Sequence, residues 1–130
     1  MKLQTFNEAL ENLGRHSLTE ANENIDIKQA LAKRYDNLSK IQAQIVQNLS
    51  QTKIADYETM QYNETLLHWL VTLSGHMSRI ASGKTYDAPN AIKYVDYYTK
   101  QIVDSIKSGK LVYESLTESM AQTFKKVYQE

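Results

Sequence analysis

The chain has 130 residues, enough for one folded domain that buries a hydrophobic core without a metal ion or a disulfide. Fifteen basic and fifteen acidic residues balance, so the chain lacks the one-sided positive charge typical of proteins that bind nucleic acid. Four glycines and one proline are too few for the many turns of an all-β fold, and the absence of cysteine excludes disulfides and thiolate chemistry.

The first predicted element is a short amphipathic helix over residues 3–13. Its apolar side chains recur at helical spacing, and Gly14 follows as a stop signal. Amide and acidic side chains interrupt this apolar pattern, which argues against a signal peptide. The polar residues that follow, up to about residue 24, are expected to form a loop.

A long helix is predicted over residues 25–49, because Leu31, Leu38 and Ile45 are spaced seven apart. Arg34 lies where this pattern requires another core residue. Two arrangements are open for it: the aliphatic stem lies on the core with the guanidinium in water, or the guanidinium pairs with a carboxylate. The first arrangement is the more common one.

The same region allows a second interpretation, a helix-turn-helix over residues 28–46 with its turn at Asp36 and Asn37. Asparagine tolerates the left-handed backbone conformation that such a turn needs. The unbroken seven-residue spacing and the balanced charge argue against this interpretation. A nucleic-acid-binding transcriptional regulator is therefore kept as the alternative function.

The densest apolar stretch and the single tryptophan lie in the next predicted helix, residues 53–82. It is separated from the preceding helix by a break at residues 48–52, with Ser50 or Thr52 as its N-cap, and Gly83 follows its end. One apolar stripe runs along it, and three further apolar side chains lie off the stripe. The stripe is Leu66, Leu70, Leu73, Met77 and Ile80, and the others are Leu67, Trp69 and Val71. A helix that is apolar on most sides belongs in the middle of a bundle.

The next helix is predicted over residues 88–108. Asp87 is its expected N-cap, Pro89 fits its first turn, and Gly109 follows as a stop signal. A last helix is expected within residues 111–128.

In that last helix Ser115 and Glu118 have the form of a capping box.

The predicted fold is an all-α, compact bundle of four to five helices in a single domain, residues 1–130. Two long helices in it are antiparallel. Apolar surface left over on such helices makes a homodimer a reasonable expectation. No segment is apolar enough to cross a bilayer, so we expect a soluble, cytoplasmic protein.

Residue types used in catalysis are present but form no recognised constellation. Glu64 and His68 share a helical face, but no second helix offers the Glu-x-x-His partner of metal-binding bundles. His76 is rotated away from His68, and we expect partly buried histidines hydrogen-bonded to backbone or hydroxyl groups. Residues 82–85, SGKT, lack the strand and the glycine of a phosphate-binding loop. We therefore predict no enzyme activity, no metal and no cofactor.

Lysines seven apart in the fourth helix, Lys93, Lys100 and Lys107, could form a basic strip. Asp96 and Asp104 lie on the same segment. We therefore interpret these lysines as part of a solvated face.

Tyrosine gives the strongest indication of function, since nine tyrosines stand against two phenylalanines and one tryptophan. Tyr94, Tyr97 and Tyr98 are neighbours on the fourth helix, with Tyr98 in the core stripe and the others at its margin. Such tyrosines either anchor protein interfaces or simply widen the core. We predict a non-enzymatic protein–protein interaction module, a small adaptor, chaperone or inhibitor whose partner is another protein.

Overall fold

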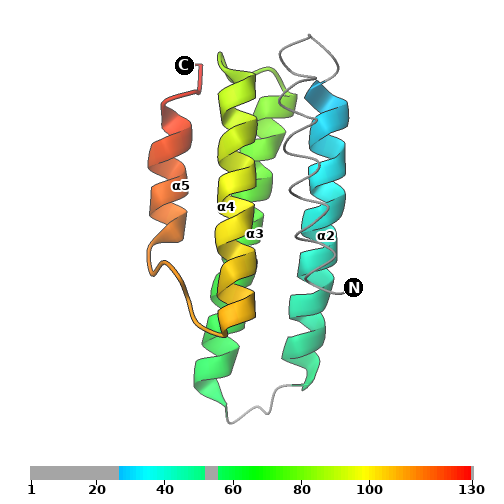
Figure 1. Ribbon diagram of the computed structural model, residues 1–130, viewed down its shortest axis with the longest axis vertical. Helices are drawn as coiled ribbons and strands as arrows, with labels where there is room; N and C mark the ends of the chain where they lie inside the picture. The colour runs from blue at the N-terminus through cyan, green and yellow to red at the C-terminus, as the bar shows by residue number, and fades with distance from the viewer. Residues whose placement is uncertain (1–26, 52–55, 130) are drawn as a thin grey trace.

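The computed structural model describes residues 27–51 and 56–129, which form an all-α bundle (Figure 1). Successive helices run in opposite directions, and the two longest lie antiparallel, as the sequence predicts. The helices are α2 (Ile27–Gln51), α3 (Tyr57–Ala81), α4 (Ala88–Ser108) and α5 (Leu116–Lys125). The helix expected over residues 3–13 lies outside the described residues. Over the two described ranges, no helix is long and apolar enough to cross a bilayer.

Helix α3 is the centre of the bundle, because it packs against α2, α4 and α5. All five residues of its predicted stripe are buried, and Trp69 is buried with them at 1% exposure. The prediction that α3 is apolar on most sides holds only in part. Val71, two residues from Trp69, is 66% exposed. Within residues 27–51 and 56–129, one side of α3 therefore has no neighbouring helix.

The break between the long helices lies later than predicted. Helix α2 continues through Ser50, whose hydroxyl donates to the Gln47 carbonyl at 2.7 Å, so Ser50 is not the N-cap of α3. Thr52 lies outside the described residues. Asp56 is the N-cap instead, and its carboxylate accepts a hydrogen bond from the Thr59 amide at 3.2 Å. A carboxylate at this position is also stabilised by the positive end of the helix dipole.

The predicted limits of α4 are confirmed. The Asp87 carboxylate caps its start by accepting a hydrogen bond from the Asn90 amide at 3.3 Å, and a proline occupies the first turn. Gly109 ends the helix with a φ of 72°. Helix α5 lies inside the predicted range of residues 111–128 but is shorter than it, and Ser115 stands at its N-cap without a side-chain capping bond.

Two glycines should respond in opposite directions to replacement by alanine. Gly109→Ala is expected to destabilise the bundle by about 1 kcal/mol, because its φ of 72° strains any residue with a Cβ. Gly75→Ala is expected to stabilise it by about 0.5–1 kcal/mol, because Gly75 lies inside α3 with open space around its missing Cβ. Urea unfolding of the two variants measures both effects. If the free energy of unfolding changes in the same direction for both, this prediction is wrong.

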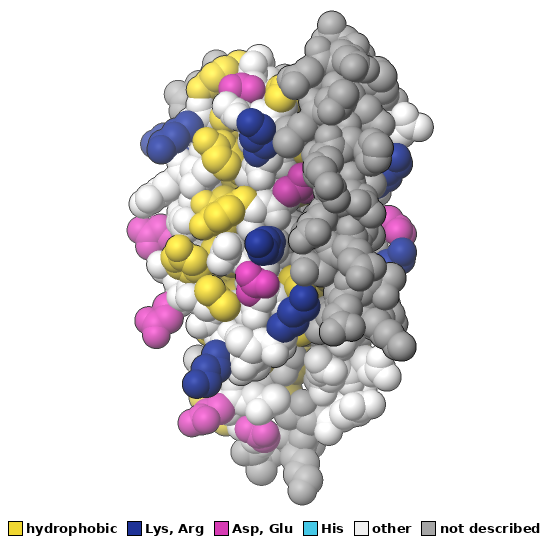
Figure 2. Space-filling view, in the orientation of Figure 1, with side chains coloured by type: hydrophobic (Ala, Val, Ile, Leu, Met, Phe, Trp, Pro, Cys, Tyr) yellow, Lys and Arg dark blue, Asp and Glu magenta, His cyan; other side chains and the backbone are white. Residues whose placement is uncertain are grey.

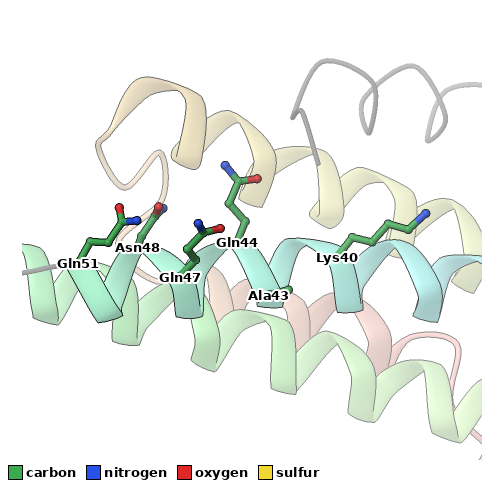
Figure 3. A pocket seen from close by; sticks show the side chains of 6 residues that line it. All are labelled: Lys40, Ala43, Gln44, Gln47, Asn48 and Gln51. Carbon is green, nitrogen blue, oxygen red and sulfur yellow. The ribbon is translucent and has the colours of Figure 1, made fainter.

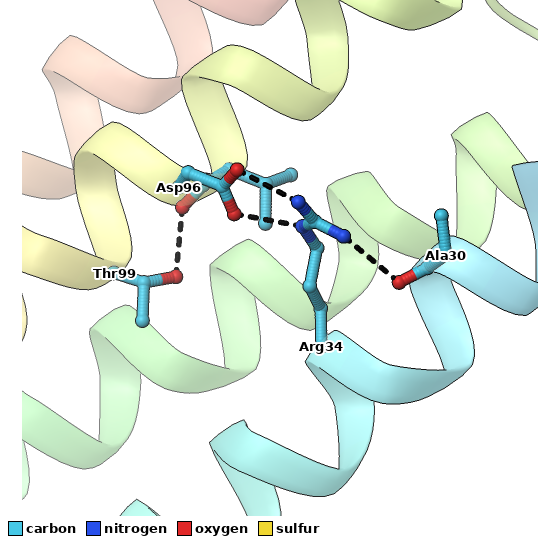
Figure 4. A network of polar contacts seen from close by, with 5 residues as sticks. Ala30, Arg34, Asp96 and Thr99 are labelled. Atoms are coloured by element: carbon cyan, nitrogen blue, oxygen red, sulfur yellow. Dashed lines mark hydrogen bonds and ion pairs between the residues drawn. The ribbon is translucent and has the colours of Figure 1, made fainter. Parts of the chain in front are cut away.

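Arg34 is buried, and its charge is paired (Figure 4). Its Nε and Nη2 donate to the two carboxylate oxygens of Asp96 at 2.7 and 2.8 Å, and Nη1 donates to the Ala30 carbonyl at 3.0 Å. The more common arrangement, with the guanidinium in water, is therefore wrong, and pairing with a carboxylate is right. This two-pronged ion pair connects α2 with α4.

The turn of the helix-turn-helix is absent from the structure. Helix α2 runs unbroken through Asp36 and Asn37. Asn37 is buried, and Asp36 forms an ion pair with Lys40 one turn later, at 3.1 Å. The proposed motif at residues 28–46 is thus wrong, because these residues belong to one continuous helix rather than to two short ones.

The end of the described chain pairs with the connection between α3 and α4. Thr85 and Tyr128 form an isolated antiparallel bridge. The Tyr86 amide donates to the Val127 carbonyl, and the Gln129 amide donates to the Lys84 carbonyl, each at 3.0 Å. These bonds hold the C-terminal side of α5 against the top of the bundle in Figure 1.

Candidate protein-binding surface

Of the three tyrosines singled out by the sequence, Tyr98 is buried, with 3% exposure. Its hydroxyl lies 2.7 Å from the Thr123 hydroxyl and donates to the Ser119 carbonyl at 3.2 Å. Tyr98 therefore connects α4 with α5 through hydrogen bonds.

Tyr94 and Tyr97 lie at the margin of the core, where the sequence places them. Tyr94 is half-buried, and the edge of its ring meets Phe124 at a centroid distance of 6.0 Å. Tyr97 is 47% exposed and packs edge-on against Tyr98 at 5.0 Å. Both side chains thus have one apolar side fixed by the core and another side that faces outward.

The structure adds two residues that the sequence did not single out, Val112 and Tyr113, in the connection between α4 and α5. They are 46% and 43% exposed. The pKa of Tyr97 lies above its usual 10, because the nearby Tyr113 hydroxyl favours the neutral form of Tyr97 over its phenolate. We call Tyr94, Tyr97, Val112 and Tyr113 the tyrosine surface. Figure 2 shows hydrophobic side chains in a line over α4 and α5.

The lysines of α4 lie beside this surface. Lys93, Lys100 and Lys107 are exposed, and none of them forms an ion pair with another described residue. Asp96 does not neutralise them as the sequence suggested, because its carboxylate is held by Arg34. The α4 side of the tyrosine surface therefore carries these three lysines against the single carboxylate of Asp104.

The two histidines of α3 have different surroundings. His68 is exposed. His76 is half-buried and stacks flat on Phe124, with centroids 4.2 Å apart and an interplanar angle of 9°. Neither nitrogen of His76 has a hydrogen-bond partner among the described residues, so the expected hydrogen bonds to backbone or hydroxyl groups are not found there for this residue. Throughout the described residues, no group of three acidic or histidine side chains is placed to hold a metal ion.

His76 should make the stability of the bundle depend on pH. Burial, and next the charge of Arg79, lower its pKa from 6.5 to about 4. Above pH 6.5 the imidazole is neutral in both states and has no effect. As the pH falls from 6.5 towards 4, His76 binds a proton in the unfolded chain but not in the folded chain. The free energy of unfolding therefore decreases progressively over this range.

His76→Phe keeps an aromatic ring on Phe124 and removes the titrating group. We expect this variant to lose less stability than the wild type between pH 6.5 and 4 in urea unfolding. His68→Gln is the matched control on the same helix, and its pH profile should follow the wild type. Identical profiles for all three proteins would contradict the role of His76.

Among the described residues, two hollows are lined mainly by side chains of α2. One, of about 400 Å³, is lined by Lys40, Ala43, Gln44, Gln47, Asn48 and Gln51, and their longer side chains project from the same side of the helix (Figure 3). The other, of about 260 Å³, lies between α2 and α3 beside Tyr35 and Val71. The first offers amide groups and one lysine, and the second offers apolar side chains and hydroxyls. Neither contains a pair of groups suited to acid–base catalysis.

Comparisons of this chain with models of protein families, with curated proteins and with solved structures find no match.

Proposed function

We propose that this chain is a non-enzymatic interaction module that binds another protein through the tyrosine surface. The observation that carries this proposal is the pair Tyr97 and Tyr113, two aromatic side chains that are 47% and 43% exposed. Tyr97 packs edge-on against the buried Tyr98, and the nearby Tyr113 side chain raises the pKa of the Tyr97 hydroxyl. Because Tyr97 is already packed against Tyr98, covering it with a partner costs little further side-chain conformational entropy.

An adaptor, a chaperone or an inhibitor would use such a surface in the same way. Tyrosine contributes a large apolar area together with a hydroxyl that can hydrogen-bond at the edge of the contact. The surface combines residues from α4 and from the following connection, and Tyr98 and Phe124 form its base. A rigid aromatic base under exposed rings is typical of the central contacts of protein interfaces.

The test compares the wild type with Tyr97→Ala/Tyr113→Ala in affinity capture from an extract of the native host, followed by quantitative mass spectrometry. Loss of two anchoring tyrosines is expected to cost about 2 kcal/mol or more, so the bound partner should fall about thirtyfold. Tyr57→Ala, a 72% exposed tyrosine at the start of α3, is the matched control and should retain the partner. If the captured proteins are the same for all three, the tyrosine surface has no role in binding.

The homodimer expected from the sequence stays a prediction. Light scattering on the same three proteins measures it directly. A dimer that dissociates in the double variant would identify a second copy of the chain as the partner.

A further inference from the structure

The lysines beside the tyrosine surface repeat at a fixed interval along α4. Lys93, Lys100 and Lys107 are seven residues apart, so they succeed one another about every 10.5 Å along one side of the helix. All three are exposed, and Tyr97 lies between the first two. Figure 2 shows Lys and Arg side chains close to the line of hydrophobic ones.

Arg34 determines the charge of this side of α4. It binds both carboxylate oxygens of Asp96, and the Asp96 side chain is only 18% exposed. Asp104 remains as a half-buried carboxylate between Lys100 and Lys107, and it forms no ion pair with the described residues. On α4, three lysines against one free aspartate leave a positive strip next to Tyr97, whereas the exposed Glu114 adds a negative charge beside Tyr113 in the connection.

The spacing favours a helical partner. A helix lying along α4 presents side chains seven residues apart on one face at the same interval of about 10.5 Å. An extended strand covers this distance in about three residues, and an odd step points to the opposite face of the strand. A helix can therefore match all three lysines, whereas a regular strand cannot.

We propose that the partner at the tyrosine surface is an acidic amphipathic helix. Its apolar side chains lie on Tyr97 and Tyr113, and its Asp or Glu residues, seven apart, face Lys93, Lys100 and Lys107. This inference rests on the proposed function and names the chemical class of the partner. Opposite charges across the contact set the register and orientation of the helix and speed its association.

A nucleic acid fits the same strip less well. The Asp104 carboxylate lies within the strip and would repel a phosphate backbone, and the chain as a whole has no net positive charge. An acidic helix avoids this repulsion, because the residue that it places opposite Asp104 can be neutral or basic.

The experiment uses the full chain and three fluorescent probes in anisotropy titrations. Two are synthetic amphipathic helices of about three heptads, identical except for glutamate or lysine at every seventh position. The third is single-stranded oligothymidylate. The charge-reversed protein is Lys93→Glu/Lys100→Glu/Lys107→Glu. The control is Lys33→Glu/Lys84→Glu/Lys125→Glu, which changes the net charge equally at exposed lysines on α2, the α3–α4 connection and α5.

We expect the glutamate probe to bind the wild type more tightly than the lysine probe, and more weakly as salt rises. The charge-reversed protein should bind the glutamate probe about tenfold more weakly and should prefer the lysine probe, whereas the control protein should stay within about twofold of the wild type. This exchange of preference is the result that a general loss of folding cannot produce.

The inference is overturned if the wild type does not prefer the glutamate probe, if both triple variants weaken equally, or if oligothymidylate binds most tightly. Its failure is distinguishable from failure of the proposed function. If Tyr97→Ala/Tyr113→Ala loses its captured partner while the charge-reversed protein keeps it, the surface binds a protein that is not an acidic helix. If the tyrosine variant keeps its partner, both proposals fall.

Discussion

Replacing Arg34 by alanine is expected to destabilise the bundle by about 3 kcal/mol, near the lower end of the range for breaking a buried ion pair. The substitution leaves the Asp96 carboxylate, 18% exposed, without its two guanidinium donors, and it removes the donor to the Ala30 carbonyl. Urea unfolding of Arg34→Ala, Asp96→Ala and the double variant measures the loss and the coupling between the two residues.

The ion pair of Asp36 and Lys40 is the matched control. It joins residues four apart on α2, and the two side chains are 65% and 51% exposed. Because water and salt screen such a pair, Lys40→Ala should cost at most about 0.5 kcal/mol. Equal losses for Arg34→Ala and Lys40→Ala would show that the pair between α2 and α4 is no more important than a surface contact.

The second large effect is expected for Trp69. Trp69→Ala should cost about 3–5 kcal/mol, because it removes the largest fully buried side chain of the described core and leaves a cavity between α3 and its neighbours. Val71→Ala, two residues later on the exposed side of α3, should change stability by less than about 0.5 kcal/mol. Thermal or urea unfolding of both variants tests this contrast. Similar losses would mean that the two sides of α3 are equally covered.

The long helices could be predicted because their apolar side chains repeat with the period of a helix. Leu31, Leu38 and Ile45 are all buried as expected. Their burial follows from a local pattern that is present in any stretch of ten to twenty residues. The end of α4 at Gly109 was predictable for the same reason, since a glycine that adopts positive φ after a helix is a local signal.

Features that depend on residues distant in sequence could not be predicted. The partner of Arg34 is 62 residues away, and several carboxylates could equally have reached it. The pattern of α3 makes Trp69 and Val71 alike, and only the placement of the other helices decides that one is buried and the other exposed.

For the candidate surface, too, the part that follows from a local pattern could be predicted and the part that depends on distant residues could not. The repeating pattern placed Tyr94 and Tyr97 at the margin of α4. Tyr113 comes from an irregular segment, which has no period, and its position beside Tyr97 depends on how the chain turns between α4 and α5.

The pairing of Thr85 with Tyr128 has a consequence for how the molecule opens. Helix α5 has ten residues, too few to persist as a helix once it leaves the bundle. The amides of Tyr86 and Gln129 are bonded across this pairing, so they become accessible to solvent when the C-terminal segment detaches. We therefore expect the exchange of these two amide protons to report detachment of α5 and melting of its backbone as one cooperative step.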